Sequence, residues 1–165
     1  MRNFLKPVLS LILLSLLGGC ANLGVMPTSN LTADQKLQQN RRTVQVATTL
    51  ATKAALLAVD SNDAQKTAVV IAKVADAVVQ ATANDQLDLT QVRLIADKVI
   101  ADLATDPRQK LIASQTLDTI AILVQDRIDA DTATLSPTDK RRIAIALINS
   151  AAQGALDATA IFISN

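Results

Sequence analysis

The sequence has no histidine, glutamate, tryptophan or tyrosine, and it has one cysteine among its 165 residues. Most hydrolytic chemistry needs a base that titrates near neutral pH, which is usually a histidine or a tuned glutamate. Without histidine, a serine–histidine–aspartate triad and a cysteine–histidine pair are excluded. A zinc site built from cysteine and histidine ligands is excluded too. These absences predict a protein that is not an enzyme and that holds no metal or other cofactor.

The aspartates are the acidic groups that remain, and they form two small clusters. Asp85 and Asp88 share a polar stretch, and Asp126, Asp129 and Asp131 precede the last expected helix. Neither cluster has the alternating acids, central glycine and closing glutamate of a calcium loop. Aspartate also caps helices and solvates turns, and we favour that role here. No serine has a lysine three residues later, so serine–lysine nucleophile chemistry has no motif either.

The N-terminus combines a short basic stretch with an apolar run. Arg2 and Lys6 supply the positive charges, and residues 8–17 are apolar apart from two serines. An apolar run of about ten residues is too short to span a membrane as a helix, which takes about 20. A basic end, an apolar core and the small residues that follow are the three parts of a secretory signal peptide. We therefore expect residues 1–19 to be cleaved.

The only cysteine follows this leader directly, in the run Leu17-Gly18-Gly19-Cys20. This run resembles the lipobox of bacterial lipoproteins, although that family more often has Ala or Ser at the position of Gly18. The resemblance implies a diacylglyceryl group on the Cys20 thiol, cleavage before Cys20 and, in many bacteria, acylation of the new amine. Two or three acyl chains hold a protein firmly, whereas one chain binds marginally. The residue after Cys20 is Ala21 and not Asp, which would be a sorting signal at this position. In this respect the chain resembles lipoproteins that are sorted to the outer membrane.

Two alternatives stay open for the leader. Cys20 could lie by chance beside an ordinary cleavage site, or the whole leader could be an uncleaved anchor. In the lipoprotein interpretation, residues 20–31 are the lipidated cysteine and a flexible tether, because residues 21–31 carry no charge. Eleven extended residues reach at most about 40 Å.

The expected mature chain, residues 20–165, is nearly neutral. Once Arg2 and Lys6 are removed, 14 basic residues face 15 acidic ones. This balance gives no general attraction to nucleic acid. The length fits one domain with a real core. Phe162 is the only aromatic residue after the leader, so the interior must be filled by Ala, Val, Ile and Leu.

Capping patterns and apolar spacing predict five α-helices and no strands after residue 31. Thr32 and Gln35 have the spacing of a capping box, and Asp106-Pro107 and Ser136-Pro137 each combine a cap with a proline at the first helical position. The expected helices cover about residues 32–59, 63–83, 89–104, 107–128 and 137–162. Short connections imply antiparallel neighbours, so residues 32–165 are predicted to form a compact all-α bundle.

Apolar residues at helical spacing predict the buried face of each helix. The first two helices are expected to bury Ala47, Leu50, Ala51, Ala54, Leu57 and Ala58, and then Ile71, Val74, Ala75, Val78 and Ala81. The next two are expected to bury Val92, Ile95, Ala96, Val99, Ile100 and Leu103, and then Leu117, Ile120, Ala121, Val124 and Ile128. The last is expected to bury Leu147, Ile148, Ala151, Ala155 and Ala158, with Phe162 in its final turn.

Two basic clusters and two stripes of small residues are candidate interaction surfaces. The clusters are Arg41 with Arg42, and Lys140, Arg141 and Arg142. Each charge near an anionic lipid surface is worth about 1 kcal/mol, but a solvated face is the favoured interpretation. The small residues, four apart, are Ala47, Ala51 and Ala55 in the first helix and Ala151 and Ala155 in the last. They fit an oligomer interface or, as we favour, close packing inside one bundle.

These observations favour a lipid-anchored cell-envelope lipoprotein with a non-enzymatic helical domain. Its first expected role is as an interaction or scaffold subunit, with a protein partner in the envelope and attachment to the outer membrane through Cys20. A second is a carrier that holds a small apolar ligand or lipid between its helices. A third is a phage- or plasmid-encoded exclusion or lysis lipoprotein.

Overall fold

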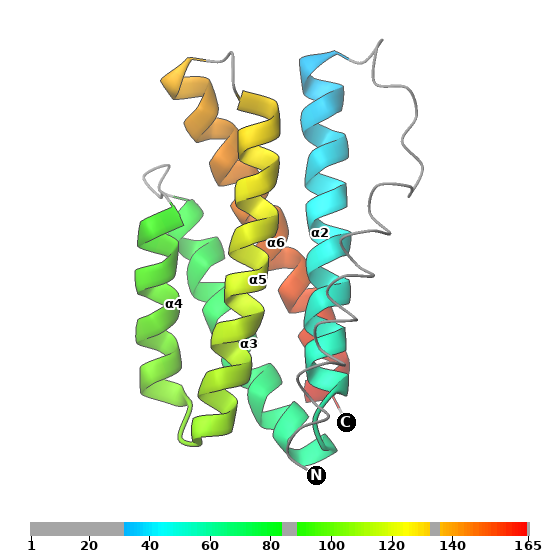
Figure 1. Ribbon diagram of the computed structural model, residues 1–165, viewed down its shortest axis with the longest axis vertical. Helices are drawn as coiled ribbons and strands as arrows, with labels where there is room; N and C mark the ends of the chain where they lie inside the picture. The colour runs from blue at the N-terminus through cyan, green and yellow to red at the C-terminus, as the bar shows by residue number, and fades with distance from the viewer. Residues whose placement is uncertain (1–31, 84–88, 133–135, 165) are drawn as a thin grey trace. The chain divides into compact units, whose positions relative to one another are not determined.

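The computed structural model describes residues 32–83, 89–132 and 136–164. These residues contain five α-helices and no strands, and 92% of them are helical, which confirms the predicted all-α bundle (Figure 1). The helices are α2 (Ala33–Leu57), α3 (Ser61–Thr82), α4 (Leu89–Leu103), α5 (Pro107–Thr132) and α6 (Pro137–Ile163).

Contacts divide the chain into a unit of residues 1–36 and a unit of residues 37–165. The described part of the first unit is the beginning of α2, where the predicted capping box is present. The Thr32 N–H donates to Gln35 Oε1 (2.9 Å), and the Gln35 N–H donates to Thr32 Oγ1 (3.3 Å). The second unit contains the rest of α2 and the other four helices.

The predicted start signals are confirmed at the later helices. Asp60 caps α3, because its Oδ1 accepts a hydrogen bond from the Asp63 N–H (3.0 Å). Ser136 caps α6 in the same way through the Asp139 N–H (3.2 Å). Such side chains satisfy backbone donors that have no partner within the helix. The end of α5 differs from the expected one, because the helix continues to Thr132, about four residues further.

The buried face of α2 is not the predicted one. Its buried residues are Val44, Thr48, Thr52 and Leu56, which recur every fourth position. The expected inward residues Leu50 and Leu57 are 45% and 73% exposed, so that prediction is wrong. The prediction followed alanine and leucine and disregarded threonine, whose methyl group packs like that of valine while its hydroxyl is polar.

The other buried faces largely follow the sequence. Four of the five expected inward residues of α3 are buried, as are all five of α6, and Phe162 is half-buried against the core. Two further predictions are wrong. Leu103 is 46% exposed because α4 ends there, and Ala121 of α5 is exposed. Helix α3 packs against α4, α5 and α6, and most extensively against α6.

Helices α2 and α6 approach each other closely at Gly154. A Cβ atom at this position would overlap the backbone carbonyl oxygen of Gln45, so no larger residue fits. Three side chains of α2 bond to α6 around this point. Arg41 Nε donates to Ser150 Oγ (3.2 Å), Gln45 Nε2 donates to Asp157 Oδ2 (2.9 Å), and Thr49 Oγ1 lies 3.0 Å from the Gly154 carbonyl oxygen. Both helices run in the same direction here (Figure 1).

Candidate functional site

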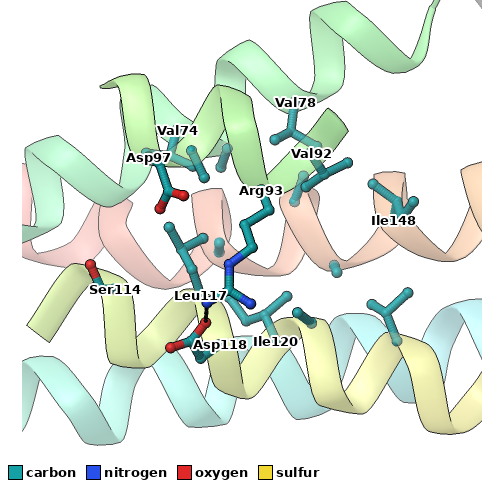
Figure 2. A pocket seen from close by; sticks show the side chains of 17 residues that line it. Val74, Val78, Val92, Arg93, Asp97, Ser114, Leu117, Asp118, Ile120 and Ile148 are labelled. Atoms are coloured by element: carbon teal, nitrogen blue, oxygen red, sulfur yellow. Dashed lines mark ion pairs between the residues drawn. The ribbon is translucent and has the colours of Figure 1, made fainter. Parts of the chain in front are cut away.

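A cavity of about 200 Å³ lies between α3, α4, α5 and α6 (Figure 2). Its walls are mainly aliphatic. The aliphatic lining residues are Val74, Ala75 and Val78 of α3, Val92 and Ala96 of α4, Leu117, Ile120, Ala121 and Val124 of α5, and Ile148, Ala151, Ala152 and Ala155 of α6. The lining therefore comes from four consecutive helices, and only their packing in the folded bundle creates it.

The cavity exists because alanine is common where these helices face one another. Protein interiors are close-packed, and voids larger than a water molecule are few. Six of the lining residues are alanines, whose side chains end at Cβ and leave the space between the helices unfilled. Bulky aromatic side chains would fill such a space, but the only one after the leader, Phe162, does not line the cavity.

The polar lining residues sit on two neighbouring helices. Arg93 and Asp97 lie four residues apart on α4, and Ser114 and Asp118 lie four residues apart on α5. Residues at this spacing share one helix face. Arg93 Nη2 reaches Asp118 Oδ1 at 2.9 Å, and the two side chains are 68% and 52% exposed. Figure 2 shows this ion pair joining α4 to α5 beside the cavity, so it marks the side that faces solvent, which we name the mouth.

The predicted lipid-attachment residue Cys20 lies outside the described residues, and so do Asp85 and Asp88. The cleavage site and the tether of residues 20–31 lie outside them as well. The proposed anchor therefore depends on the sequence argument and stays a prediction.

The two basic clusters are both placed, one on α2 and the other in the first turns of α6. Arg42, Arg141 and Arg142 are exposed and Lys140 is half-buried. Arg41 is exposed too, but its guanidinium bonds to Ser150 of α6. Ser150 lies eight residues after Arg142, which is about 12 Å along the helix. Contact of either cluster with an anionic surface stays a prediction.

Asp126, Asp129 and Asp131 belong to helix α5 and not to a turn. Asp126 and Asp129 are exposed, and Asp129 Oδ1 accepts a hydrogen bond from Gln125 Nε2 (2.8 Å). Within residues 32–83, 89–132 and 136–164, no group of three or more His, Cys, Asp or Glu side chains is arranged to hold a metal ion.

Helix α6 is apolar enough and long enough to cross a membrane, the only one of the described helices with both properties. Half of its apolar window is buried inside the bundle. The core helix of a soluble protein can have the same composition, and α6 packs against α3 and α5. Its apolar character is therefore explained by its place in the core.

Sequence reasoning missed the mouth of the cavity and the approach at Gly154. The sequence did contain a sign of the mouth, because Arg93 and Asp118 are charged residues next to the apolar faces of their helices. Which helices pair could not be deduced from spacing alone. The signal for the close approach was that Gly154 is the only glycine within the five helices.

Comparisons with protein-family models, with curated proteins and with solved structures find no match to this chain. The class that the fold defines is an all-α bundle, and the function is inferred from its cavity and from the leader.

Proposed function

We propose that this protein is a lipid-anchored cell-envelope lipoprotein whose helical bundle binds a small apolar ligand, without enzymatic activity. The cavity between α3, α4, α5 and α6 is the observation that carries the ligand-binding role. On sequence alone a scaffold role came first, and the cavity reverses that order because a carrier needs a void between its helices.

The size and lining of the cavity suit a small apolar molecule. A dry engineered cavity of about 150 Å³ with aliphatic and aromatic walls binds benzene, and the cavity here measures about 200 Å³. Ligand pockets are typically apolar, with a few polar groups that fix orientation. Here the polar groups are all at the mouth. A ligand would restore the dispersion contacts that the lining atoms lack while the cavity is empty.

Calorimetric titration of the full chain carrying Cys20→Ser with octan-1-ol tests the ligand-binding role. We expect saturable heat and a melting temperature that rises with octanol, because a ligand that binds only the folded state stabilises it. Ala152→Leu should abolish the heat by filling the cavity. Ala160→Leu is the matched control, because Ala160 is exposed on the same helix and does not line the cavity.

A second variant that obstructs the cavity keeps the test valid if the Ala152→Leu protein does not fold. Ala121 is exposed and lines the cavity, so Ala121→Leu should block entry without strain in the core. If Ala152→Leu and Ala121→Leu both fold and still give binding heat with octanol, the heat arises from a site other than this cavity. Absence of saturable heat in the unplugged chain would refute the role.

The anchor is tested separately by cell fractionation. Cys20→Ser should move the protein from the membrane pellet to the soluble fraction, because the thiol that accepts the lipid is gone. Ala21→Ser is the control, since it changes a neighbour and keeps the thiol. If the Cys20→Ser protein stays in the pellet through the same washes, lipidation is not the anchor.

A scaffold role has one supporting observation, which is the solvent-facing stripe of α2. Val46, Leu50 and Leu57 are 53%, 45% and 73% exposed, and Val46 and Leu50 lie one turn apart. Exposed apolar side chains that share a helix face suit a protein partner. Leu50→Asp should then reduce recovery of a reproducible partner in crosslinking of intact envelopes. An unchanged set of crosslinked proteins would count against this role.

A further inference from the structure

The charges at the mouth of the cavity are unequal. Among the lining residues Arg93 is the only cation, whereas Asp97 and Asp118 are both anions. Arg93 and Asp118 form an ion pair (2.9 Å), and Asp97 makes no ion pair within the described part of the chain. One negative charge, at Asp97, is therefore left without a compensating cation at the mouth.

The position of Asp97 is fixed by the pairing of α4 with α5. The two helices follow each other along the chain through a short connection and run in opposite directions (Figure 1). Because Arg93 meets Asp118, a step of one turn along each helix brings Asp97 level with Ser114. Figure 2 shows Arg93, Asp97, Ser114 and Asp118 around the side chain of Leu117. A carboxylate and a hydroxyl thus flank the mouth next to the ion pair.

We propose that the cavity takes a short-chain amphiphile with an ammonium head group, whose tail lies between the helices and whose head pairs with Asp97. This inference rests on the proposed function, since it needs a cavity that admits an apolar tail. An anionic head would meet the uncompensated charge of Asp97, while Arg93 is already engaged. Like charges at such a mouth repel and opposite charges attract, more strongly at the edge of a low-dielectric interior than in water.

The cavity volume limits the tail. Benzene, with six carbons, occupies a cavity of about 150 Å³, so about 200 Å³ corresponds to a tail of about eight carbons. A membrane phospholipid with two long acyl chains exceeds this volume, which leaves single short-chain amines as the ligand class.

Three probes of equal chain length separate the head-group effect from the tail. These are octylamine, octan-1-ol and octanoate, titrated at pH 7 and low salt into the full chain carrying Cys20→Ser. We expect octylamine to bind about fivefold more tightly than octanol, the most that a solvent-exposed ion pair typically supplies, and octanoate to bind more weakly than octanol. The preference for octylamine should shrink as salt is added, because salt screens exposed charges.

Two variants change the charge of the mouth in opposite directions. Asp97→Asn removes the uncompensated charge, so octylamine and octanol should then bind equally. Arg93→Gln frees a second carboxylate and should enlarge the preference for octylamine. Asp102→Asn is the control, because Asp102 is exposed on the same helix and does not line the cavity, so this loss of one negative charge should leave the preference near fivefold.

The outcomes distinguish this inference from the proposed function. If octanol binds but octylamine has no advantage, or if the advantage survives Asp97→Asn, the ammonium assignment is wrong and the apolar cavity site stands. If none of the three probes binds, the proposed function fails together with the assignment.

Discussion

Two faces of α6 both carry small residues, and they produce opposite results. On the face toward α2, Gly154 allows the helices to approach until a single added carbon would overlap the Gln45 carbonyl. On the face toward α3, α4 and α5, Ala151, Ala152 and Ala155 border a cavity of about 200 Å³. Small residues thus allow tight packing on the face toward α2, the closed face, and leave a cavity on the face toward α3, α4 and α5, the open face.

The difference follows from how many helices share each interface. At Gly154 two backbones meet, and side chains of α2 such as Arg41 and Thr49 bond across to α6. Around the cavity, α3 contacts α4, α5 and α6 at once, and α4 and α5 contact each other. No one of these helices can move into the void without losing contact with the others. A pair of helices can therefore close on small residues, whereas a ring of four keeps a space at its centre.

The largest expected effect tests which face of α2 belongs to the bundle. Leu56 is fully buried and Leu57 is 73% exposed, although they are adjacent. Leu56→Ala should lower the free energy of unfolding by about 2–5 kcal/mol through lost burial and a new cavity. Leu57→Ala should change it by less than about 0.5 kcal/mol. Urea denaturation of both variants measures this, and equal losses would contradict the assignment of the buried face.

The closed face of α6 predicts the next largest effect. Gly154→Ala should destabilise the protein by about 1–3 kcal/mol, because the added methyl forces two backbones apart. In an exposed helix position the same change is stabilising by about 0.5–1 kcal/mol. Gln153→Ala, at an exposed neighbouring position, is the control and should be close to neutral. A Gly154→Ala protein that melts at a higher temperature would disprove the close approach.

The open face predicts the opposite sign for added carbons. Ala152→Leu places new methyl groups in the cavity and should stabilise the folded state by about 0.5–2 kcal/mol, which is typical of cavity filling. Thermal unfolding of Ala152→Leu and Gly154→Ala together compares the two faces directly. Destabilisation of both to the same extent would mean that the two faces are equally packed.

A smaller effect is expected from the threonines buried in α2. The Oγ1 atom of Thr52 is buried and has no hydrogen-bond partner. A buried hydroxyl without a partner is costly, and an apolar isostere removes that cost. Thr52→Val should therefore stabilise the protein by about 1 kcal/mol. Thr49→Val, which removes a hydroxyl that contacts Gly154, should destabilise it, and the reverse order in urea midpoints would contradict the assigned contacts.

The sequence predicted the helices better than their contacts. Helix starts at Thr32, Asp60 and Ser136 depend on bonds to residues three positions away, so local patterns suffice. The buried face of α2 was mispredicted because threonine packs there through its methyl group. A space between the helices was expected only under the carrier alternative, and its position and lining were not predicted. They depend on which helices surround the space, and neither spacing nor composition specifies that arrangement.

The central claim is that α3, α4, α5 and α6 enclose an apolar site that can be occupied. A crystal structure determined under xenon pressure tests it directly, because xenon enters dry apolar cavities without needing a polar contact. We predict xenon between Ile148, Ala152 and Val124, and a lower xenon occupancy in the Ala152→Leu protein, whose three added carbons take up part of the space. A structure in which side chains fill this space, with no xenon bound, would contradict the account.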